Sequence, residues 1–390
     1  MILAHKIQIN ANKTQLKYFA QAAGTSRFVW NWALGEWNKQ YQEGLKPNAN
    51  ALKKEFNAIK YEKFPWLKGM HRDSHSQPFA NLNKAFNTFF KDIKAGKPAH
   101  APVFKKKGKT NDSFYIANDK FKVIENTAIL PVLGKVKLAE KLRFEGKVLS
   151  GVVSRTANKW YLSVQVEVPD IKAIKRRKSS NVVGVDLGLT TLATLSTGEK
   201  ITAPKPLKRY KRRLKIRARA YSRRLKPTKK AKKPQTLNAR KSAAILAKTH
   251  KRITNIRVDF CHKLTKKLCH ENQVIVLEDL NVSGMTKNHH LAKAVVDASF
   301  GIIRKQVECK SLIYKNTLLL ADPWYPSTKL CHVCKTHNPN VVLGVKTWTC
   351  TTCGTKHDRD ANASKNLEDL AYLYALPDAS TLVTKYVKSQ

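Results

Sequence analysis

The sequence predicts an α/β protein of several domains, in which a small N-terminal β-barrel interrupted by helices precedes an α/β domain with a four-cysteine metal site. Three observations support this fold class. The first half places a helical pattern between strand-like segments, the second half contains short apolar runs that end on acidic residues, and two C-x2-C pairs lie near the C-terminus. At 390 residues, the chain is long enough for two or three domains.

The predicted barrel comprises residues 1–10 and 98–172. The opening MILAHKIQIN alternates apolar and polar residues, as a half-buried strand does. Further strand-like segments lie between Ser113 and Val168, namely FYI, FKVI, AIL, GKVKL and VVSRTANKWYLSVQVEV. In the last segment, apolar residues alternate with polar ones from Trp160 to Val168, which predicts a strand with one buried face.

Residues 11–97 are predicted to form a helical insertion in this barrel. SRFVWNWALGEWNKQY, around Trp30, gives one helix. The aromatic residues of this helix could stack on bases, but core packing is the commoner use of such a stripe. Arg27 is the residue of this helix predicted to contact a phosphate. A second helix is marked by apolar residues three or four positions apart, at Phe79, Leu82, Phe86, Phe89 and Ile93.

Two basic segments flank the strand region. In the loop KPAHAPVFKKKGKTN, Lys105 and Lys106 are predicted phosphate contacts, although a solvated charge run is the ordinary interpretation of consecutive lysines. KAIKRRKSS, residues 172–180, is predicted to be a polar linker at a domain boundary.

The charge of the chain indicates a polyanionic partner. Lys and Arg number 74 against 27 Asp and Glu, a net charge of +47. Such self-repulsion is tolerable when phosphates neutralise it. No run of eighteen apolar residues is present, so nucleic acid is a simpler partner than a membrane. Since the N-terminus lacks the order of residues of a signal peptide, we expect a location in the cytoplasm or nucleoid.

Two acids terminate apolar strands of the second half. NVVGVDLGLTTLAT ends an apolar run on Asp186 and continues into a hairpin, and QVIVLEDL ends another on Glu278. A carboxylate at the end of a buried strand is costly unless a cation meets it, and a metal ion is the usual cation. An Asp in a turn is the alternative interpretation of Asp186. Asp279 is predicted to face away from Glu278, because side chains alternate along a strand.

A long basic segment separates these two strands. No Asp or Glu occurs between Glu199 and Asp259. Charge of one sign on this scale favours a groove that follows a phosphate backbone. Pro227 and Pro234 are expected to bracket a flexible tip. The predicted nucleic-acid contacts of this segment are Arg209, Arg212, Arg213, Arg223 and Arg224.

Residues 328–357 are predicted to form a zinc ribbon. Cys331 and Cys334 form one pair, Cys350 and Cys353 form another, and fifteen residues separate the pairs. Four thiolates complete the tetrahedral shell of a structural Zn²⁺. Disulfides are the alternative, but a long chain with only seven cysteines is typical of a reducing compartment. His332 and His337 are interpreted as loop residues and not as ligands.

The third candidate acid is Asp360, at the start of a predicted helix in HDRDANASKN. On its own it could be an N-cap. Together, Asp186, Glu278 and Asp360 match the Asp, Glu, Asp order of a nuclease site of the RNase H type. Carboxylates suit hard divalent ions, and a pair of Mg²⁺ or Mn²⁺ ions would act on the attacking water and the leaving oxygen of a phosphodiester.

Several of these segments together resemble the TnpB family, encoded by bacterial insertion sequences and similar to the type V CRISPR effectors. The resemblance is carried by SRFVWNWA, VFKKKGKTNDSFYI, GVDLGLTTLAT, VIVLEDLNVSGM, the CHVC and CTTC pairs, and HDRDANASKN. It implies a wedge-like barrel at residues 1–10 and 98–172 with a recognition-like insertion, a RuvC nuclease domain at 173–327 and 358–390, and the ribbon at 328–357.

The resemblance also implies an activity, RNA-guided cleavage of DNA. Asp186, Glu278 and Asp360 would bind the catalytic ions, and Asp358 would be a neighbour of the site. A guide RNA from the transposon end, one protein chain per RNA, would pair with double-stranded target DNA beside a short motif. In this kind of recognition, the guide RNA reads the target sequence by base pairing and the protein contacts the nucleic-acid backbone. A large positive surface without a base-reading helix is consistent with that role of the protein. Two alternatives stay open: a guide-directed DNA-binding repressor, and an accessory transposition factor without cleavage.

Overall fold

The computed structural model describes residues 1–169, 181–225, 236–342, 344–375 and 387–389. The chain divides into two compact units, Met1–Asp170 and Ile171–Gln390, which we call unit 1 and unit 2. The predicted linker at 172–180 and the predicted tip between Pro227 and Pro234 lie outside the described residues. The finer division into barrel, insertion, nuclease domain and ribbon stays a prediction.

Unit 1 contains a seven-stranded antiparallel sheet in the order β2-β6-β7-β1-β5-β4-β3. Strand β1 pairs with β7 and β5 at the centre, which joins the first residues of the chain to its later strands, as predicted. Closure of the sheet into a barrel stays a prediction. The strands are β1 Ile2–Asn10, β2 Ser113–Ala117, β3 Lys122–Ile124, β4 Thr127–Leu130, β5 Gly134–Leu138, β6 Lys147–Thr156 and β7 Lys159–Glu167.

The segment VVSRTANKWYLSVQVEV forms two strands and not one. Strands β6 and β7 are joined by Ala157 and Asn158, which both adopt positive φ, 49° and 66°. Two residues with φ above zero are the geometry of a tight hairpin turn. The sequence analysis missed this turn because Ala rarely takes that conformation, and the Asn alone is a weak signal.

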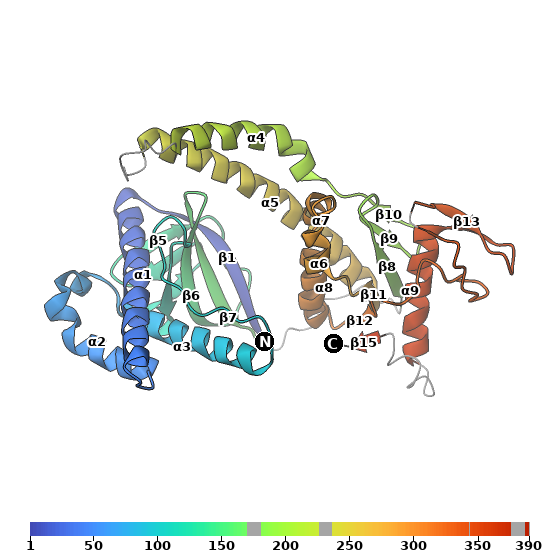
Figure 1. Ribbon diagram of the computed structural model, residues 1–390. Coiled ribbons are helices and arrows are strands. Elements are labelled where there is room, and N and C mark those ends of the chain that lie inside the picture. The colour runs from blue at the N-terminus through green and yellow to red at the C-terminus, as the bar shows by residue number, and fades with distance from the viewer. Residues whose placement is uncertain (170–180, 226–235, 343, 376–386, 390) are drawn as a thin grey trace. The chain divides into compact units, whose positions relative to one another are not determined.

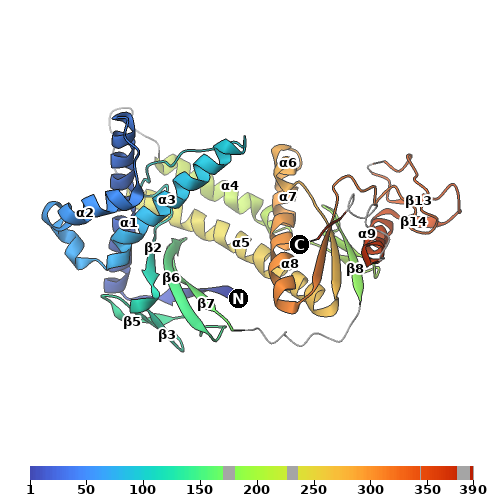
Figure 2. The ribbon, with the colours of Figure 1, turned by 90° about the horizontal axis from the view of Figure 1, so that it is seen from below.

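Between β1 and β2 the chain is helical, with α1 Lys13–Gln42, α2 Ala49–Lys63 and α3 Arg72–Lys94 and a 3₁₀ turn at Pro65–Gly69. Figure 2 shows these helices grouped together in unit 1. Trp30 and Trp37 are buried in a core with Phe79 and Phe86, and Trp37 stacks on Phe86 with ring centroids 4.1 Å apart. The interpretation of the tryptophans as core residues is therefore confirmed.

Unit 2 is built on a mixed sheet in the order β10-β9-β8-β11-β12-β15. The hairpin of β8 and β9 comes first, as predicted, and β8, β11 and β12 are parallel neighbours. Parallel strands of this kind are buried on both faces and are therefore apolar. The strands are β8 Val182–Leu187, β9 Ala193–Leu195, β10 Lys200–Ile201, β11 Val274–Glu278, β12 Thr317–Ala321 and β15 Val387–Ser389.

Two long helices of unit 2 pack along each other. The basic helix α4, Pro206–Leu225, packs along α5, Leu237–Glu271, and both views show them side by side (Figures 1 and 2). The sequence predicts one helix from Leu291 to about Tyr314, but the segment breaks at Ser299, which has a φ of 64°. The result is α7, Ala292–Ala298, and α8, Phe300–Tyr314, preceded by α6, Val282–Lys287.

The C-terminal helix α9, Arg359–Ala375, packs on the sheet of unit 2 beside β8 (Figure 1). Leu367, Leu370 and Ala371 of this helix bury their side chains against Val276 of β11 and Leu319 of β12. Just before α9, the short strands β13, Thr347–Thr349, and β14, Lys356–Asp358, form a hairpin. Among the helices of the described ranges, none has the length and apolar composition that crossing a membrane requires.

Candidate nuclease site and metal cluster

Asp186 and Glu278 occupy adjacent positions on adjacent strands. In the parallel pair of β8 and β11, Leu277 lies opposite Val185, so the next residue of each strand is one of the two acids. Gly184 and Val276, two residues earlier, both face α9. Because every second side chain of a strand shares a face, Asp186 and Glu278 project on the α9 side of the sheet.

Asp360 reaches this side of the sheet in the first turn of α9. The helix lies so close to β8 that a Cβ atom at Gly184 would come within 2.0 Å of the Ser364 carbonyl oxygen and 2.5 Å of the Glu368 backbone nitrogen. Only glycine permits this approach, because it has no Cβ. Gly184 therefore sets the position of the helix that carries the third acid.

We expect Gly184→Ala to destabilise unit 2 by about 3 kcal/mol, because the added methyl meets backbone atoms that cannot rotate away. Thermal and urea unfolding followed by circular dichroism would measure the change. Gly301→Ala in α8 is the matched control, since nothing lies within 4 Å of its added Cβ. That variant should be as stable as the parent or slightly more stable. Equal stability of the two variants would contradict the role of Gly184.

The electrostatics of the three acids reflect their proximity. Burial raises the pKa of Asp186 to about 8, and the negative charges of Glu278 and Asp360 add to the shift. Burial also raises the pKa of Glu278, while a hydrogen bond from Ser327 opposes that shift. A buried carboxylate whose pKa is raised by neighbouring carboxylates would be stabilised by a cation beside it. The oxygen donors present therefore fit a hard divalent ion.

Two further acids next to the site have structural partners. Asp358 accepts a hydrogen bond from the backbone nitrogen of Ala361, at 3.0 Å, and pairs with Lys200 at 2.7 Å. It is thus Asp358, and not Asp360, that caps the start of α9. Asp279 is paired with Arg304. Asp360 is in contact with the guanidinium of its neighbour Arg359, at 3.1 Å.

A buried hydrogen-bond network joins Glu278 to α9. Ser327, 3% exposed, donates its hydroxyl to Glu278 Oε1 at 3.1 Å. Its carbonyl oxygen accepts from the side-chain amide of Asn366 at 2.8 Å, and Asn362 and Asn366 both donate to the Leu330 carbonyl. This network connects the first cysteine pair, the acid site and α9. No local sequence pattern marks Ser327, because its partners lie far away in the chain.

If the acids hold divalent ions as predicted, Ser327→Ala should weaken the binding of those ions by about 10- to 100-fold, as loss of a group that orients a ligand usually does. Direct Mn²⁺ binding by electron paramagnetic resonance would measure the change. Ser327→Thr, which keeps the hydroxyl, should restore the Mn²⁺ affinity, and exposed Ser283→Ala should leave it unchanged. An unaltered Mn²⁺ affinity in Ser327→Ala would rule out this role.

The four predicted cysteines come together. Their sulfur atoms all lie within 4.8 Å of one another, with Cys331 and Cys353 at 3.7 Å and Cys334 and Cys350 at 3.5 Å. A tetrahedral zinc with bonds of 2.3 Å requires sulfur atoms about 3.8 Å apart, so the set fits one Zn²⁺. All four are free thiols, so the disulfide alternative is not supported.

The surroundings of the cysteines differ. Burial raises the pKa of Cys331 to about 11, whereas hydrogen bonding to Thr336 lowers the pKa of Cys334 to about 6. His357, which is buried, places its Nε2 at 3.1 Å from Cys331 Sγ. The sequence analysis did not consider His357, although its place four residues after Cys353 was a possible signal. His337 is exposed and His332 is half-buried, in accordance with their interpretation as loop residues.

Two of the predicted phosphate contacts in unit 1 have partners within the chain. Arg27 pairs with Asp112 at 2.8 Å. The Lys105 ammonium lies 3.6 Å from the centroid of the Trp30 ring, and burial lowers its pKa. Lys106 is exposed. Arg27 and Lys105 therefore contribute to the fold whether or not they also contact nucleic acid.

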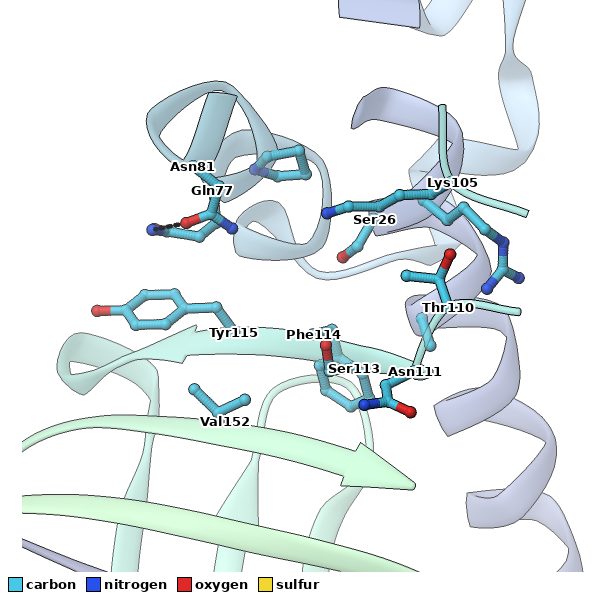
Figure 3. A pocket seen from close by; sticks show the side chains of 13 residues that line it. Ser26, Gln77, Asn81, Lys105, Thr110, Asn111, Ser113, Phe114, Tyr115 and Val152 are labelled. Atoms are coloured by element: carbon cyan, nitrogen blue, oxygen red, sulfur yellow. Dashed lines mark hydrogen bonds between the residues drawn. The ribbon is translucent and has the colours of Figure 1, made fainter. Parts of the chain in front are cut away.

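Arg27 and Lys105 also line a pocket of about 160 Å³ between α1, α3 and β2. Figure 3 shows that polar side chains from separate segments surround it, with Gln77 and Asn81 of α3 joined by a hydrogen bond of 3.3 Å. Tyr115 and Val152 line it from β2 and β6. The pocket thus combines amide, hydroxyl and cationic groups.

The basic residues predicted on α4 are exposed, namely Arg209, Arg212, Arg213, Arg223 and Arg224. Arg224 also donates to the Ser242 hydroxyl at 2.5 Å. The start of this helix is capped from α7, because Asp297 accepts from the backbone nitrogens of Leu207 and Lys208 at 2.9 and 3.0 Å. A buried carboxylate thus fixes the origin of a helix that presents cations to solvent.

Comparisons with protein families match three parts of the chain. OrfB_IS605, described as "Probable transposase", matches residues 163–289. The Cas12f1-like TNB domain matches residues 300–367, which include the four cysteines and Asp360. A helix-turn-helix domain of OrfB_IS605 matches residues 1–46, which here form β1 and α1.

Similar proteins match almost the whole chain. A protein of Streptomyces pristinaespiralis named "Putative RNA-guided DNA endonuclease" is 33% identical, over 93% of this chain and 88% of its own length. InsQ of Escherichia coli K12, with the same description, is 28% identical over 93% of this chain and 91% of its own. The mixed α/β fold is similar to a solved Cas12f1 complex with single-guide RNA and target DNA, with a TM-score of 0.52 at 13% identity, over 92% of this chain and 83% of the other. By these matches, the chain belongs to the TnpB family of insertion-sequence proteins.

Proposed function

We propose that this chain is an RNA-guided DNA endonuclease that cleaves double-stranded target DNA in a RuvC-type site. The observation that carries this proposal is the convergence of Asp186, Glu278 and Asp360 on one side of the unit 2 sheet. A DNA-binding protein without cleavage has no need to bring three carboxylates together in a protein of charge +47, since they repel phosphate. The names of the relatives support the same activity.

In this proposal, Asp186, Glu278 and Asp360 hold two divalent ions, Mg²⁺ or Mn²⁺. When bound, such ions activate a water and stabilise the leaving oxygen of a phosphodiester. The residues of the chain orient the site: Ser327 fixes one oxygen of Glu278, and Gly184 lets α9 bring Asp360 to the sheet. Cys331, Cys334, Cys350 and Cys353 hold one structural zinc, with no open position for chemistry.

The nucleic-acid partners are a transposon-end guide RNA, one per protein chain, and target DNA in the bacterial or archaeal nucleoid. The exposed arginines of α4, together with Arg27, Lys105 and Lys106, are proposed to neutralise phosphates. The pocket of unit 1 supports the reading of a short motif beside the target, since Gln77 and Asn81 offer amides, which pair well with base edges.

The experiment that tests the proposal is cleavage of a plasmid library by the purified protein, co-expressed with its transposon-end RNA. A cut that follows the guide, lies beside one short motif and disappears with EDTA is the expected result. A new guide should redirect the cut to the matching target. Binding at the guided site without a cut would contradict the endonuclease and favour the guided repressor. Activity that ignores the guide would contradict RNA guidance and favour the accessory factor.

A further inference from the structure

The loop between β12 and the cysteine cluster, residues 322–327, leaves the sheet beside Glu278. Ala321, the last residue of β12, lies opposite Glu278 in the parallel ladder. The backbone nitrogen of Asp279 donates to the Ala321 carbonyl at 3.0 Å. The loop therefore begins next to one of the three acids.

Trp324 in this loop is 86% exposed, while the residues that follow it are anchored. Tyr325 is half-buried and donates its hydroxyl to the Asn366 carbonyl of α9 at 3.2 Å. Ser327 is buried and bonded to Glu278. Tryptophan side chains are highly buried on average, so an indole in solvent between two anchored positions leaves an aromatic face free to stack on a ligand.

The indole is also held by a local turn. Asp322 Oδ1 accepts from the backbone nitrogen of Trp324 at 2.8 Å, and the Asp322 carbonyl accepts from that of Tyr325 at 3.0 Å. Asp and Asn favour such turns because their side chains bond to nearby backbone nitrogens. The turn and the Ser327 bond together fix the backbone of Trp324 relative to the carboxylate of Glu278.

We propose that Trp324 is a stacking platform for an unpaired nucleobase of the DNA strand that is cut, next to the scissile phosphate. This inference rests on the proposed function. Stacking on an aromatic ring tolerates any base, because every base has a π-face. Such a contact suits an enzyme whose sequence specificity comes from guide pairing. A base held on the indole would keep its phosphate in place at the acids.

The test compares Trp324→Ala, Trp324→Leu and Trp324→Phe in the guide-loaded full chain, with Leu312→Ala as control. Leu312 is 70% exposed on α8 and lies outside the proposed site. For Trp324→Ala, the protein concentration for half-maximal cleavage should rise by roughly 5- to 100-fold, as loss of one stacked base predicts. Trp324→Phe should need nearly the same protein concentration as the parent, because the phenyl ring can also stack. Trp324→Leu should need as much protein as Trp324→Ala, because leucine has no aromatic ring.

A second measurement reports stacking without cleavage. In an Asp360→Asn background, target DNA carries a single 2-aminopurine, placed at successive positions of the unpaired strand in a series of otherwise identical substrates. Stacking on the indole should quench its fluorescence, and Trp324→Ala should remove that quenching.

The outcomes separate this inference from the proposed function. The assignment of Trp324 as a stacking platform is wrong if the parent cuts but Trp324→Ala cuts equally well. It is also wrong if Trp324→Leu cuts as well as Trp324→Phe. If quenching is the same with and without Trp324, it is also wrong. If the parent itself never cuts guided DNA, the endonuclease proposal fails, while loss of quenching in Trp324→Ala would still support a base contact.

Discussion

Replacing Asp186 with Asn is expected to lower the rate of guided DNA cleavage by roughly 10³-fold or more, because metal ions at such sites supply several kcal/mol of transition-state stabilisation. Asparagine keeps the shape of the side chain but removes the charge that attracts the ions. Binding of guide RNA and target should persist, since the basic surfaces are unchanged. Single-turnover cleavage and a filter-binding assay of the same preparation measure the two quantities.

Asp358→Asn is the matched control for this experiment. Asparagine can still cap α9. The ion pair that is lost involves the exposed Lys200, and ion pairs at the surface contribute little to stability. This variant should therefore cleave DNA nearly as well as the parent protein. If Asp358→Asn is as inactive as Asp186→Asn, while Asp360→Asn stays active, then Asp358 would be the third metal ligand and the assignment of Asp360 would be wrong.

Loss of the zinc is expected to unfold residues 328–357, because structural zinc contributes roughly 10 kcal/mol or more to the folding of small zinc-binding domains. The apolar core available without it is small: among the described residues of this cluster, those buried beside Cys331 and Cys350 are Val341 and Trp348. Cys350→Ser should reduce the zinc content of purified protein, measured by mass spectrometry, from about one ion per chain to nearly none. Limited proteolysis should then cut within the segment.

The same variant should also reduce cleavage, since Leu330 and Ser327 are held to α9 by Asn362 and Asn366. Cys309→Ser is the control, because Cys309 is exposed and lies outside the cluster. It should retain both zinc and activity. Full cleavage by zinc-free protein would show that the acid site does not depend on the ribbon.

Local patterns were sufficient to place the acids on their elements. Asp186 and Glu278 each follow an apolar run, and burial of such a run in a parallel sheet brings its carboxyl end to a shared edge. The cysteine pairs were equally informative, because the two-residue spacing is itself the geometry of a metal knuckle. Asp360 could be identified as a candidate metal ligand only together with Asp186 and Glu278. Its place at the start of a helix does not by itself distinguish a metal ligand from a helix cap.

The features that the sequence did not predict depend on tertiary contacts or on unusual backbone conformations. Ser299 interrupts an apolar pattern that continues on both sides, and the break is visible only in its positive φ. Strand β15 pairs with β12 although 65 residues separate Ala321 from Val387 between the two strands. Ser327 and His357 acquire their roles from Glu278 and Cys331, whose proximity no local pattern encodes.

Helix α9 follows β8 and β11 in the chain, so ribosomes make it after the two strands that bear Asp186 and Glu278. Gly184 and the strand that bears Asp186 are made early in unit 2, whereas the helix that docks on them is made after the basic helices and after the strand that bears Glu278. On the proposed function, a nascent chain gains its basic surface and two acids well before the third. A premature stop between Glu278 and Asp360 would then leave the basic helices and two of the three acids, so the shortened chain should bind nucleic acid without cutting it.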